Sequence, residues 1–263
     1  MSISKNEGKA VQKILCIGGS TLNKGTIEKI KDALIETKFL QKWAVIFVNH
    51  DYFKISYKPA ETQISKDKIQ KESHGINIKF LEQVGDHLIH KNNVYILPDP
   101  SKVLPAEENE EDWRSADCIE KNGQVMLQVL EPQSSFEKYD QWFENKRCDA
   151  GGKERSFDTM PYIDKFMKEL ADVTTKIKDV KIAGLILCGL GGDGAYGLKE
   201  IKNKGGATAV QNPGECLHPK RGKTTCSMPH TALTLDKNSP HQKISIKGNS
   251  EVMSLIQWLD SIR

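Results

Sequence analysis

The sequence predicts an α/β fold, with a doubly wound and mainly parallel sheet between two layers of helices, in a single domain of 263 residues. Two observations carry this prediction. Short runs of valine, isoleucine and leucine are continuously apolar, as strands buried on both faces of a parallel sheet are. Segments with one apolar helical face lie between those runs and again at the end of the chain, and this alternation is typical of βαβ units.

Five apolar runs are the expected strands of the sheet. Each is short, and each is followed by polar, proline or glycine residues that end it. In chain order they are Ile14–Ile17, Ala44–Val48, Val94–Leu97, Ile182–Cys188 and Ala207–Gln211.

Three segments carry apolar residues at helical spacing and are the expected helices. They are Thr26–Leu40, Thr159–Val173 and Glu251–Ile262, the last of which docks on the sheet and leaves little room for a second domain. The side chains expected to face the core are Ile27, Ile30, Leu34 and Phe39 in the first, Ile163, Phe166, Met167 and Leu170 in the second, and Val252, Leu255, Ile256 and Leu259 in the third.

The segment Pro105–Arg155 departs from this alternation. It combines an acidic run, Glu107–Asp112, with one expected strand, Gln124–Leu130, and polar sequence that contains aromatic residues. Loops of this length inside a domain are functional lids or poorly ordered segments, and the aromatic residues favour packing. We therefore expect an inserted, ordered flap or lid over residues 105–155 and a flexible tail over residues 1–12.

Composition and charge exclude several classes of protein. The chain has 38 lysine and arginine residues against 35 aspartate and glutamate residues, a formal net charge of only +3, so nucleic-acid binding is not expected. No apolar run approaches the roughly 18 residues of a membrane span, and the first residues lack the apolar stretch of a secretion signal. We expect a cytoplasmic protein without membrane insertion.

The six cysteines contain no C-x-x-C pair. Cys16 and Cys188 lie in apolar runs, so reduced and buried thiols are the expected state. Cys216 and Cys226 share one polar loop, where a disulfide or a shared metal ion is the alternative. Without a second cluster of ligands we expect no metal site.

Three of the expected strands end in a turn that presents a chemically useful side chain, and in doubly wound sheets sites assemble at such carboxyl ends. The first is ILCIGGSTLNKG, in which Gly18 and Gly19 turn the chain and bring Ser20 to the edge of the sheet. Ser20 is a candidate nucleophile. The alternatives are a helix cap or a phosphate-binding turn, and G-x-S-x-L is not the nucleophile elbow of the α/β-hydrolases.

The other two segments supply a base and an acid. His50 directly follows the strand in AVIFVNHDYF, where neighbouring strand ends bring a base close to a serine, and the alternative is a histidine satisfied by backbone groups. Asp193 lies in GLILCGLGGDGAYGL and is placed to orient His50 and to stabilise its imidazolium form. The chain order of this triad, Ser20 then His50 then Asp193, differs from that of the α/β-hydrolases.

The glycines around Asp193 also fit a different function. The run from Gly189 to Gly194 satisfies G-x-G-x-x-G between a strand and a helix, which is the dinucleotide fingerprint of Rossmann-like, three-layer α/β/α folds. The next strand, however, ends in Gln211 and Asn212 where a ribose-binding acid is expected, and the motif lies late in the chain. A nucleotide-binding protein is the alternative to a hydrolase.

Together, these segments resemble the catalytic domain of the chemotaxis protein-glutamate methylesterases of the CheB type. The family's Gly-Ala-Ser-Thr turn is similar to Gly18–Thr21, its histidine after a valine-rich strand to His50, and its Thr-Gly-Met-Gly-x-Asp-Gly-Ala segment to Cys188–Ala195. Further similarity lies in Asn93–Pro98, in Ser156-Phe157-Asp158 at the start of a helix, and in Ser227-Met228-Pro229.

The resemblance implies a catalytic domain over residues 1–263 that acts as a serine hydrolase. Such enzymes remove methyl esters from chemoreceptor glutamates, and some also deamidate receptor glutamines, so the implied partners are the cytoplasmic domains of methylated chemoreceptors. No cofactor is implied. The implied roles are nucleophile for Ser20, base for His50, orienting acid for Asp193, oxyanion donors at Leu190 and Thr21, and close substrate approach at Gly191 and Gly192.

Several departures from the family pattern bear on substrate choice. Leu22–Gly25 replaces the glycines that usually follow Ser-Thr, Asp51-Tyr52 replaces a Met-Pro, and Lys153–Arg155 replaces a His-Arg-Pro. The loop Gly214–Cys226 is longer and basic. Its candidate substrate-binding residues are Lys220 and Arg221, for which a solvated surface loop is the alternative.

The family's amino-terminal receiver domain is not expected, because the first strand begins within fifteen residues of Met1. Control would then come from a separate regulatory protein or from the flap, or the enzyme would be constitutively active. A catalytically silent adaptor that binds receptors without turnover is the remaining alternative.

Overall fold

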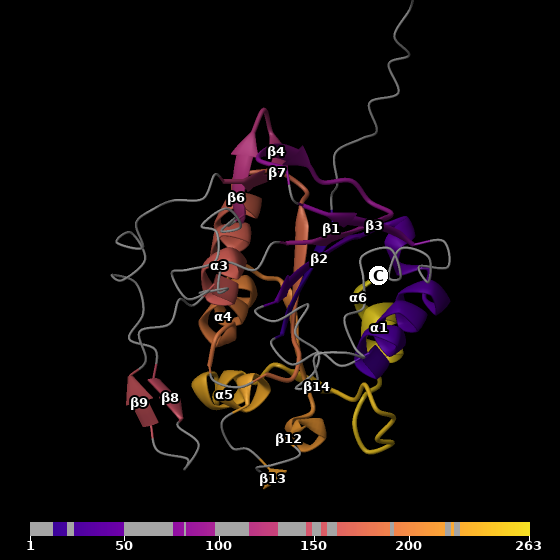
Figure 1. Cartoon of the computed structure of the whole chain (residues 1–263), viewed down its shortest axis with the longest axis vertical. Coiled ribbons are helices and arrows are strands. Elements are labelled where there is room, and N and C mark those ends of the chain that lie inside the picture. The colour runs from indigo at the N-terminus through magenta and orange to yellow at the C-terminus, as the bar shows by residue number, and fades with distance from the viewer. Residues whose placement is uncertain are drawn as a thin grey trace, which may run out of the picture.

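The computed structural model describes residues 13–19, 24–49, 76–81, 83–97, 116–130, 146–148, 154–156, 162–189, 192–218, 222–223 and 227–263. The elements in these ranges form three layers, with a central sheet between two groups of helices (Figure 1). The expected α/β fold with a mainly parallel sheet is confirmed.

The central sheet has seven strands in the order β14-β11-β10-β1-β2-β5-β3, and every neighbouring pair is parallel. β1 is therefore the central strand, with β10 on one side and β2 on the other. The strands are β1 (Lys13–Gly19), β2 (Ala44–Asn49), β3 (Asn77–Phe80), β5 (Asn93–Ile96), β10 (Lys181–Ile186), β11 (Ala207–Gln211) and β14 (Gln242–Ile244).

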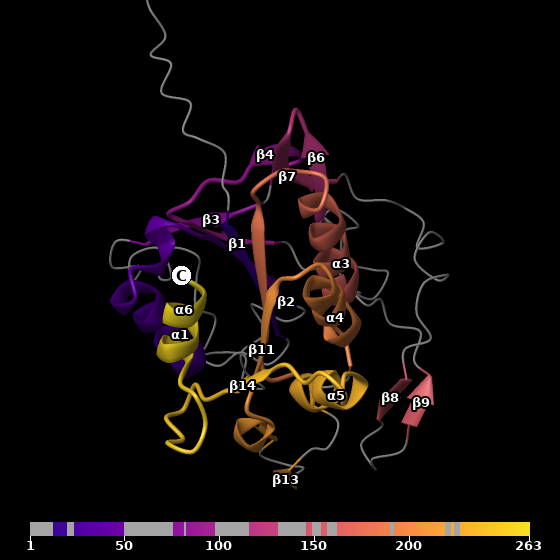
Figure 2. The same ribbon diagram turned by 180° about the vertical axis from the view of Figure 1, so that it is seen from behind.

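Helices cover both faces of this sheet, as the two opposite views show (Figures 1 and 2). On one face lie α1 (Lys24–Glu36) and α6 (Leu255–Ile262), with the short 3-10 helix η1 (Phe39–Gln41). On the other face lie α3 (Tyr162–Thr174), α4 (Ala195–Asn203) and α5 (Met228–Leu235).

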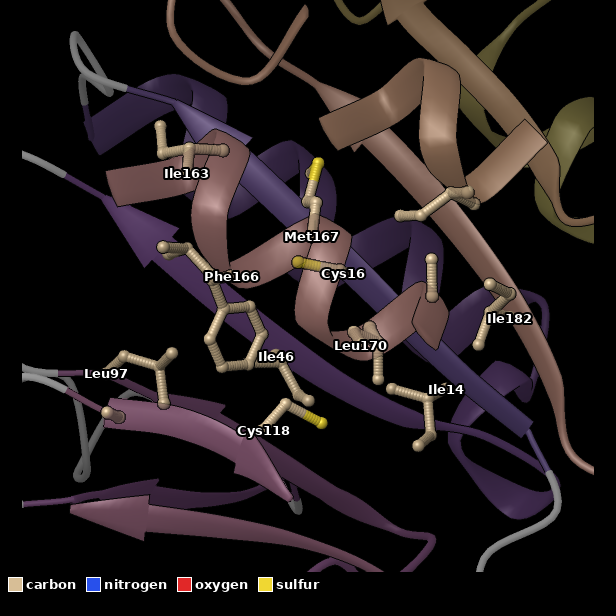
Figure 3. Close-up of a cluster of buried hydrophobic side chains, with 14 of the residues drawn as sticks. Ile14, Cys16, Ile46, Leu97, Cys118, Ile163, Phe166, Met167, Leu170 and Ile182 are labelled. Atoms are coloured by element: carbon tan, nitrogen blue, oxygen red, sulfur yellow. The ribbon is translucent and has the colours of Figure 1, made fainter. Parts of the chain in front are cut away.

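The alternation of side chains along β1 contributes to a hydrophobic core on each side of the sheet. Ile14 and Cys16 belong to the core beneath α3, where the apolar face of that helix packs over them (Figure 3). Leu15 and Ile17 belong to the core beneath α1 and α6. All four side chains are buried, which explains why the strand is apolar at successive positions and carries no period of two.

The expected strands of the central sheet are all present, and β11 has the expected ends. β10 is shorter than expected and ends at Ile186, so Cys188 lies in the following turn. α6 begins at Leu255 because Ser254 and Gln257 form a capping box there, three residues after the apolar spacing begins at Val252.

A second sheet lies beside α3 and consists of three antiparallel strands, in the order β4 (Gly85–Leu88), β7 (Gln124–Val129) and β6 (Ala116–Lys121). β6 and β7 form a hairpin whose turn, Asn122-Gly123, has φ values of 55° and 72°. These are the left-handed values that Asn-Gly accommodates in tight hairpins.

Two strands of this antiparallel sheet, β6 and β7, lie within the segment expected to form a flap, and they pack into the core. Cys118, Leu127 and Val129 are buried in the same cluster as α3, and Lys165 of α3 forms an ion pair with Asp117 of β6. Within residues 105–155, the remaining described residues are β8 (Lys146–Cys148) and the start of its antiparallel partner β9 (Glu154–Ser156). The rest of the segment lies outside the described residues, and a lid there stays a prediction.

One buried histidine makes the fold sensitive to acid. His241 is 3% exposed, its Nδ1 lies 2.8 Å from Thr208 Oγ1, and its Nε2 has no hydrogen-bond partner within the described residues. Burial, with a smaller contribution from the Lys202 ammonium, lowers the pKa of His241 from 6.5 to about 4, although Asp236 acts in the opposite direction. The imidazole is therefore neutral in the folded protein at neutral pH.

We predict that the free energy of unfolding falls as the pH is lowered from 6.5 to 4, because the unfolded chain binds a proton at His241 that the folded chain does not. This stabilisation is fully present above pH 6.5, and its loss amounts to about 3 kcal/mol at pH 4. Urea unfolding of wild type and His241→Gln over this range measures it. The variant should show the flatter pH dependence, whereas His87→Gln, at a histidine whose Nε2 lies 2.7 Å from the Gln83 carbonyl oxygen, serves as the control and should keep the wild-type slope. Equal slopes in wild type and His241→Gln would contradict the prediction.

Candidate active site

The three strand ends that carry the expected triad lie next to one another. β1 is hydrogen-bonded to both β2 and β10, and the register pairs Gly19 with Asn49 and Gly18 with Ile186. The amide of Leu187 then donates to the Gly18 carbonyl at 2.8 Å, which extends the β1–β10 contact past the end of β10. The parallel sheet therefore brings three segments that are far apart in sequence to one edge.

Ser20 and His50 each directly follow one of these paired residues. Gly19 precedes Ser20 and Asn49 precedes His50, and adjacent strands of a sheet lie about 4.8 Å apart. Ser20 and His50 themselves lie outside the described residues, as do Thr21, Leu190, Gly191, Lys220 and Arg221.

Asp193 is described and is 2% exposed, in the turn between β10 and α4. Its two carboxylate oxygens accept hydrogen bonds from the first turn of α3, Oδ2 from the amide of Ile163 at 3.1 Å and Oδ1 from the amide of Asp164 at 2.9 Å. The first amides of a helix have no partner within the helix, and the partial positive charge there stabilises a carboxylate. Asp193 thus caps α3 from outside, and this contact holds its side chain in place.

The return contact comes from Asp164, in the first turn of α3. Its Oδ1 accepts a hydrogen bond from the amide of Gly197 at 2.7 Å, in the first turn of α4. The N-cap of α4 is Gly194, which has no side chain with which to cap the helix, so the acceptor is supplied by the neighbouring helix. α3 and α4 therefore cap each other, each through one aspartate, and we call this arrangement the reciprocal cap.

The two helices can cap each other only because small residues let them approach. A Cβ at Gly197 would lie 2.6 Å from Met167 Cβ and 2.7 Å from the Asp164 carbonyl oxygen. A Cβ at Gly18 would lie 2.5 Å from Ile163 Cγ2, so the end of β1 also packs directly against the first turn of α3. Larger residues at either position would push α3 away from the site.

The Asp164 carboxyl is 0% exposed, and its Oδ2 has no hydrogen-bond partner within the described part of the chain. Burial raises the pKa of Asp164 well above its ordinary value, and the nearby charge of Asp193 raises it further. The amides of Gly197, Tyr196 and Gly194 favour the ionised form but do not outweigh these two effects. These effects together favour the protonated form of Asp164.

The turn after β10 is held from three sides. The amide of Cys188 donates to Gln211 Oε1 at 3.0 Å, and the amide of Met228 donates to the Gly189 carbonyl at 3.0 Å. The third attachment is a disulfide between Cys188 and Cys216, directly after the 3-10 helix η4 (Pro213–Glu215).

This disulfide corrects the expectation of a reduced, buried thiol at Cys188. The residue lies in the turn after β10, next to the end of β11 rather than inside a strand, and there it meets Cys216. Cys16 is free and buried as expected, and burial raises the pKa of its thiol. Cys226 lies outside the described residues, so Cys216 pairs with a different partner from the one considered.

A second correction concerns the start of α3. The expected segment Ser156-Phe157-Asp158 does not begin that helix, because Ser156 is the last residue of β9 and α3 starts at Tyr162. The aspartate in the first turn is therefore Asp164.

The apolar spacing of α3 predicts a core helix but does not indicate that the helix contributes to the site. Asp164 lies three residues before Met167 and seven before Ala171, which are both fully buried, so it occupies the apolar stripe of the helix. An aspartate on a buried stripe is a signal of a specific polar partner. That signal was available in the sequence, but the partner could be found only in the structure.

The reciprocal cap also bears on the dinucleotide alternative. In such folds the pyrophosphate binds to the free amides at the start of the helix after the glycine-rich turn. Here the amide of Gly197 is already bonded to a buried carboxyl group, whose oxygens would repel a phosphate. Gln211, at the position expected for a ribose-binding acid, is buried and bonded to Cys188 and Glu215.

Within the described ranges, no group of three or more His, Cys, Asp and Glu side chains is arranged to hold a metal ion. None of the helices in those ranges combines the length and apolar character that crossing a membrane requires.

Comparison with known proteins identifies the group to which this arrangement is similar. The family model described as CheB methylesterase matches residues 15–241. A protein-glutamate methylesterase/protein-glutamine glutaminase of Methanococcus maripaludis is 43% identical over 58 residues, which is 22% of this chain and 16% of that protein's length. The match thus spans less than a fifth of this curated relative. The crystal structure of the Thermotoga maritima CheB methylesterase catalytic domain has 15% sequence identity and a TM-score of 0.49, over 89% of this chain and 92% of that chain.

We predict that reducing the Cys188–Cys216 disulfide lowers the free energy of unfolding by about 3.5 kcal/mol, because the bond closes a loop with a sequence separation of 28. Urea unfolding with and without dithiothreitol measures this change. The double variant Cys188→Ser/Cys216→Ser is the matched control and should show no effect of the reductant. Alkylation of both Cys188 and Cys216 in the untreated, denatured protein would show that the bond is absent.

Proposed function

This chain belongs to the CheB methylesterase family, and on that basis we propose that it is a protein-glutamate methylesterase, a serine hydrolase that removes methyl esters from glutamates of chemoreceptors. The proposed partners are the cytoplasmic domains of methylated chemoreceptors, and the proposed compartment is the cytoplasm. The relative from Methanococcus maripaludis is also a protein-glutamine glutaminase, so we include deamidation of receptor glutamines as a second reaction of the same site.

The observation that carries this proposal is the register of the three central strands. It pairs the residue before Ser20 with the residue before His50, and it pairs Gly18 with the last residue of β10, the strand that leads to Asp193. A serine, a histidine and an aspartate whose segments leave one sheet edge side by side are the components of a nucleophile, a base and an orienting acid.

In the proposed reaction, Ser20 Oγ attacks the carbonyl carbon of the glutamyl methyl ester while His50 accepts the hydroxyl proton. The tetrahedral intermediate collapses when its bond to the methoxy oxygen breaks, and His50 delivers the proton to that oxygen, so methanol leaves. Water then attacks the acyl-enzyme with His50 again as the base. The products are methanol, a free glutamate side chain and unmodified Ser20.

Asp193 has the third role, in which a carboxylate orients the histidine and stabilises its imidazolium form. Its two hydrogen bonds from α3 support this role, because they fix the orientation of the carboxyl group at the start of a helix, where the helix dipole favours a negative charge. The proposed oxyanion donors are the amide of Leu190 and the segment at Thr21, and removal of one such donor would cost about 10²–10³ in rate. Close approach of the substrate backbone is proposed at Gly191 and Gly192.

For Ser20→Ala we expect methanol release from a methylated chemoreceptor domain to be abolished, because the acyl-enzyme cannot form. Asp193→Asn should lower kcat on the order of 10⁴-fold, because the amide does not hold the histidine in the required tautomer. Methanol and the loss of receptor methyl groups are measured together, with circular dichroism to show that each variant is folded.

The matched control is Ser261→Ala, on α6 and on the opposite face of the sheet from α3, which should retain wild-type turnover. Wild-type turnover in folded Ser20→Ala would exclude the serine mechanism. Receptor binding without methanol release in the wild type would favour a silent adaptor, and saturable NAD binding would favour the nucleotide-binding alternative. Charge-neutral variants of Lys220 and Arg221 test whether the basic loop contributes to KM.

A further inference from the structure

Asp164 is a fully buried carboxyl group to which the proposed reaction assigns no step. It lies in the first turn of α3, is 0% exposed, and leaves Oδ2 without a hydrogen-bond partner in the described ranges. Burial of a polar group without full replacement of its hydrogen bonds destabilises a fold, whereas burial of an apolar residue of similar size stabilises it. An aspartate at this position therefore calls for an explanation in terms of what its contacts do.

Two hydrogen bonds connect Asp164 to Asp193 and to the helix that follows it. The backbone amide of Asp164 donates to Asp193 Oδ1 at 2.9 Å, and its side-chain Oδ1 accepts from the amide of Gly197 at 2.7 Å. Asp193 directly precedes Gly194, the N-cap of α4, and Gly197 lies in the first turn of the same helix. One residue of α3 thus binds the Asp193 side chain with its backbone and binds the helix that follows Asp193 with its side chain.

We propose that Asp164 is a positioning residue for Asp193: its carboxyl group fixes the start of α4 against α3 and thereby holds the Asp193 carboxylate where the histidine needs it. The inference rests on the proposed function, in which Asp193 orients His50. Asp164 does not touch the substrate in this scheme, and it acts through the reciprocal cap. Asp164 can be tested separately from Asp193, because loss of the Asp164 side chain removes the acceptor for the Gly197 amide of α4 but keeps both amides that bind Asp193.

The hydrogen bond that Asp164 Oδ1 accepts from the Gly197 amide determines which substitution should preserve its role. Burial and the charge of Asp193 raise the pKa of Asp164, a shift that favours its neutral acid. Asparagine has the same shape as that neutral acid and keeps a carbonyl oxygen as acceptor for the Gly197 amide. Alanine removes the acceptor altogether.

The test compares Asp164→Ala with Asp164→Asn in the full chain by methanol release. For Asp164→Ala we expect kcat to fall about 10- to 100-fold with KM changed less than threefold, because a small displacement of a catalytic group costs up to about 10²-fold in rate while the substrate-binding loops are untouched. For Asp164→Asn we expect kcat within threefold of wild type. Asp164→Ser, which shortens the side chain but keeps a hydroxyl, replaces the alanine variant if that variant does not fold.

Hydrogen exchange of the peptide that contains residues 192–200 provides a readout that does not depend on activity. Exchange should be faster in Asp164→Ala, whose Gly197 amide has lost its acceptor, and unchanged in Asp164→Asn. Thr174→Ala is the matched control, because it removes a buried polar group at the other end of α3, where Thr174 Oγ1 donates to the Ala171 carbonyl. That control should lower stability without changing kcat or exchange at residues 192–200.

The outcomes distinguish the positioning role of Asp164 from the proposed esterase function. An active wild type with wild-type kcat and exchange in Asp164→Ala would overturn the positioning role and leave the esterase assignment intact. An active wild type in which Asp164→Asn loses as much kcat as Asp164→Ala would also overturn it, since the neutral isostere should suffice. A wild type that releases no methanol would overturn the proposed function, and with it the role of Asp164 in catalysis.

Discussion

Two helices that begin side by side at a buried sheet edge must find acceptors for amides that water cannot reach. α3 and α4 meet this constraint through each other, because Asp193 accepts from the first turn of α3 and Asp164 accepts from the first turn of α4. The arrangement needs close contact between the helices, and Gly197 permits it. The position of Asp193 thus depends on the packing of two helices as much as on the strand that precedes it.

The same region joins the core to the candidate site. Ile163 packs against the end of β1 at Gly18, and the next residues of α3 toward its C-terminus cover Cys16 and Ile14 (Figure 3). Attachments beyond the helices, at Gly189 and through the Cys188–Cys216 disulfide, hold the other end of the turn. The turn that carries Asp193 is therefore supported at both ends, as a group that must keep its orientation during a reaction requires.

The central part of the fold could be predicted because its strands are buried on both faces. β1, β2, β10 and β11 are read directly as apolar runs, and the order of side chains at their ends indicates a shared site. The edge strands β3 and β14, with the sequences NIKF and QKI, contain too few apolar residues for the same argument. The hairpin turn Asn122-Gly123 was a local signal for β6, but the acidic sequence before it obscured that strand.

For the site, the sequence indicated the candidate residues but not the contacts that hold them in place. The glycines around Asp193 marked it as a candidate, whereas the partners of Asp164 are known only once α3 and α4 are placed together in space. The cysteine pairing likewise depends on the exact end of β10, since two residues decide whether Cys188 lies in a strand or in a turn. Contacts between segments far apart in sequence carry no local pattern from which to infer them.

The position of β1 in the sheet also determines when its two neighbouring strands become available during synthesis. β2 follows β1 closely along the chain, but β10, the other neighbour of β1, begins only at Lys181. At a translation rate of about 5–20 residues per second, the nascent chain presents an unpaired edge of its central strand for many seconds. The candidate site cannot assemble before β10 pairs with β1, so the edge of β1 stays open to pairing with other chains for as long as the protein is inactive.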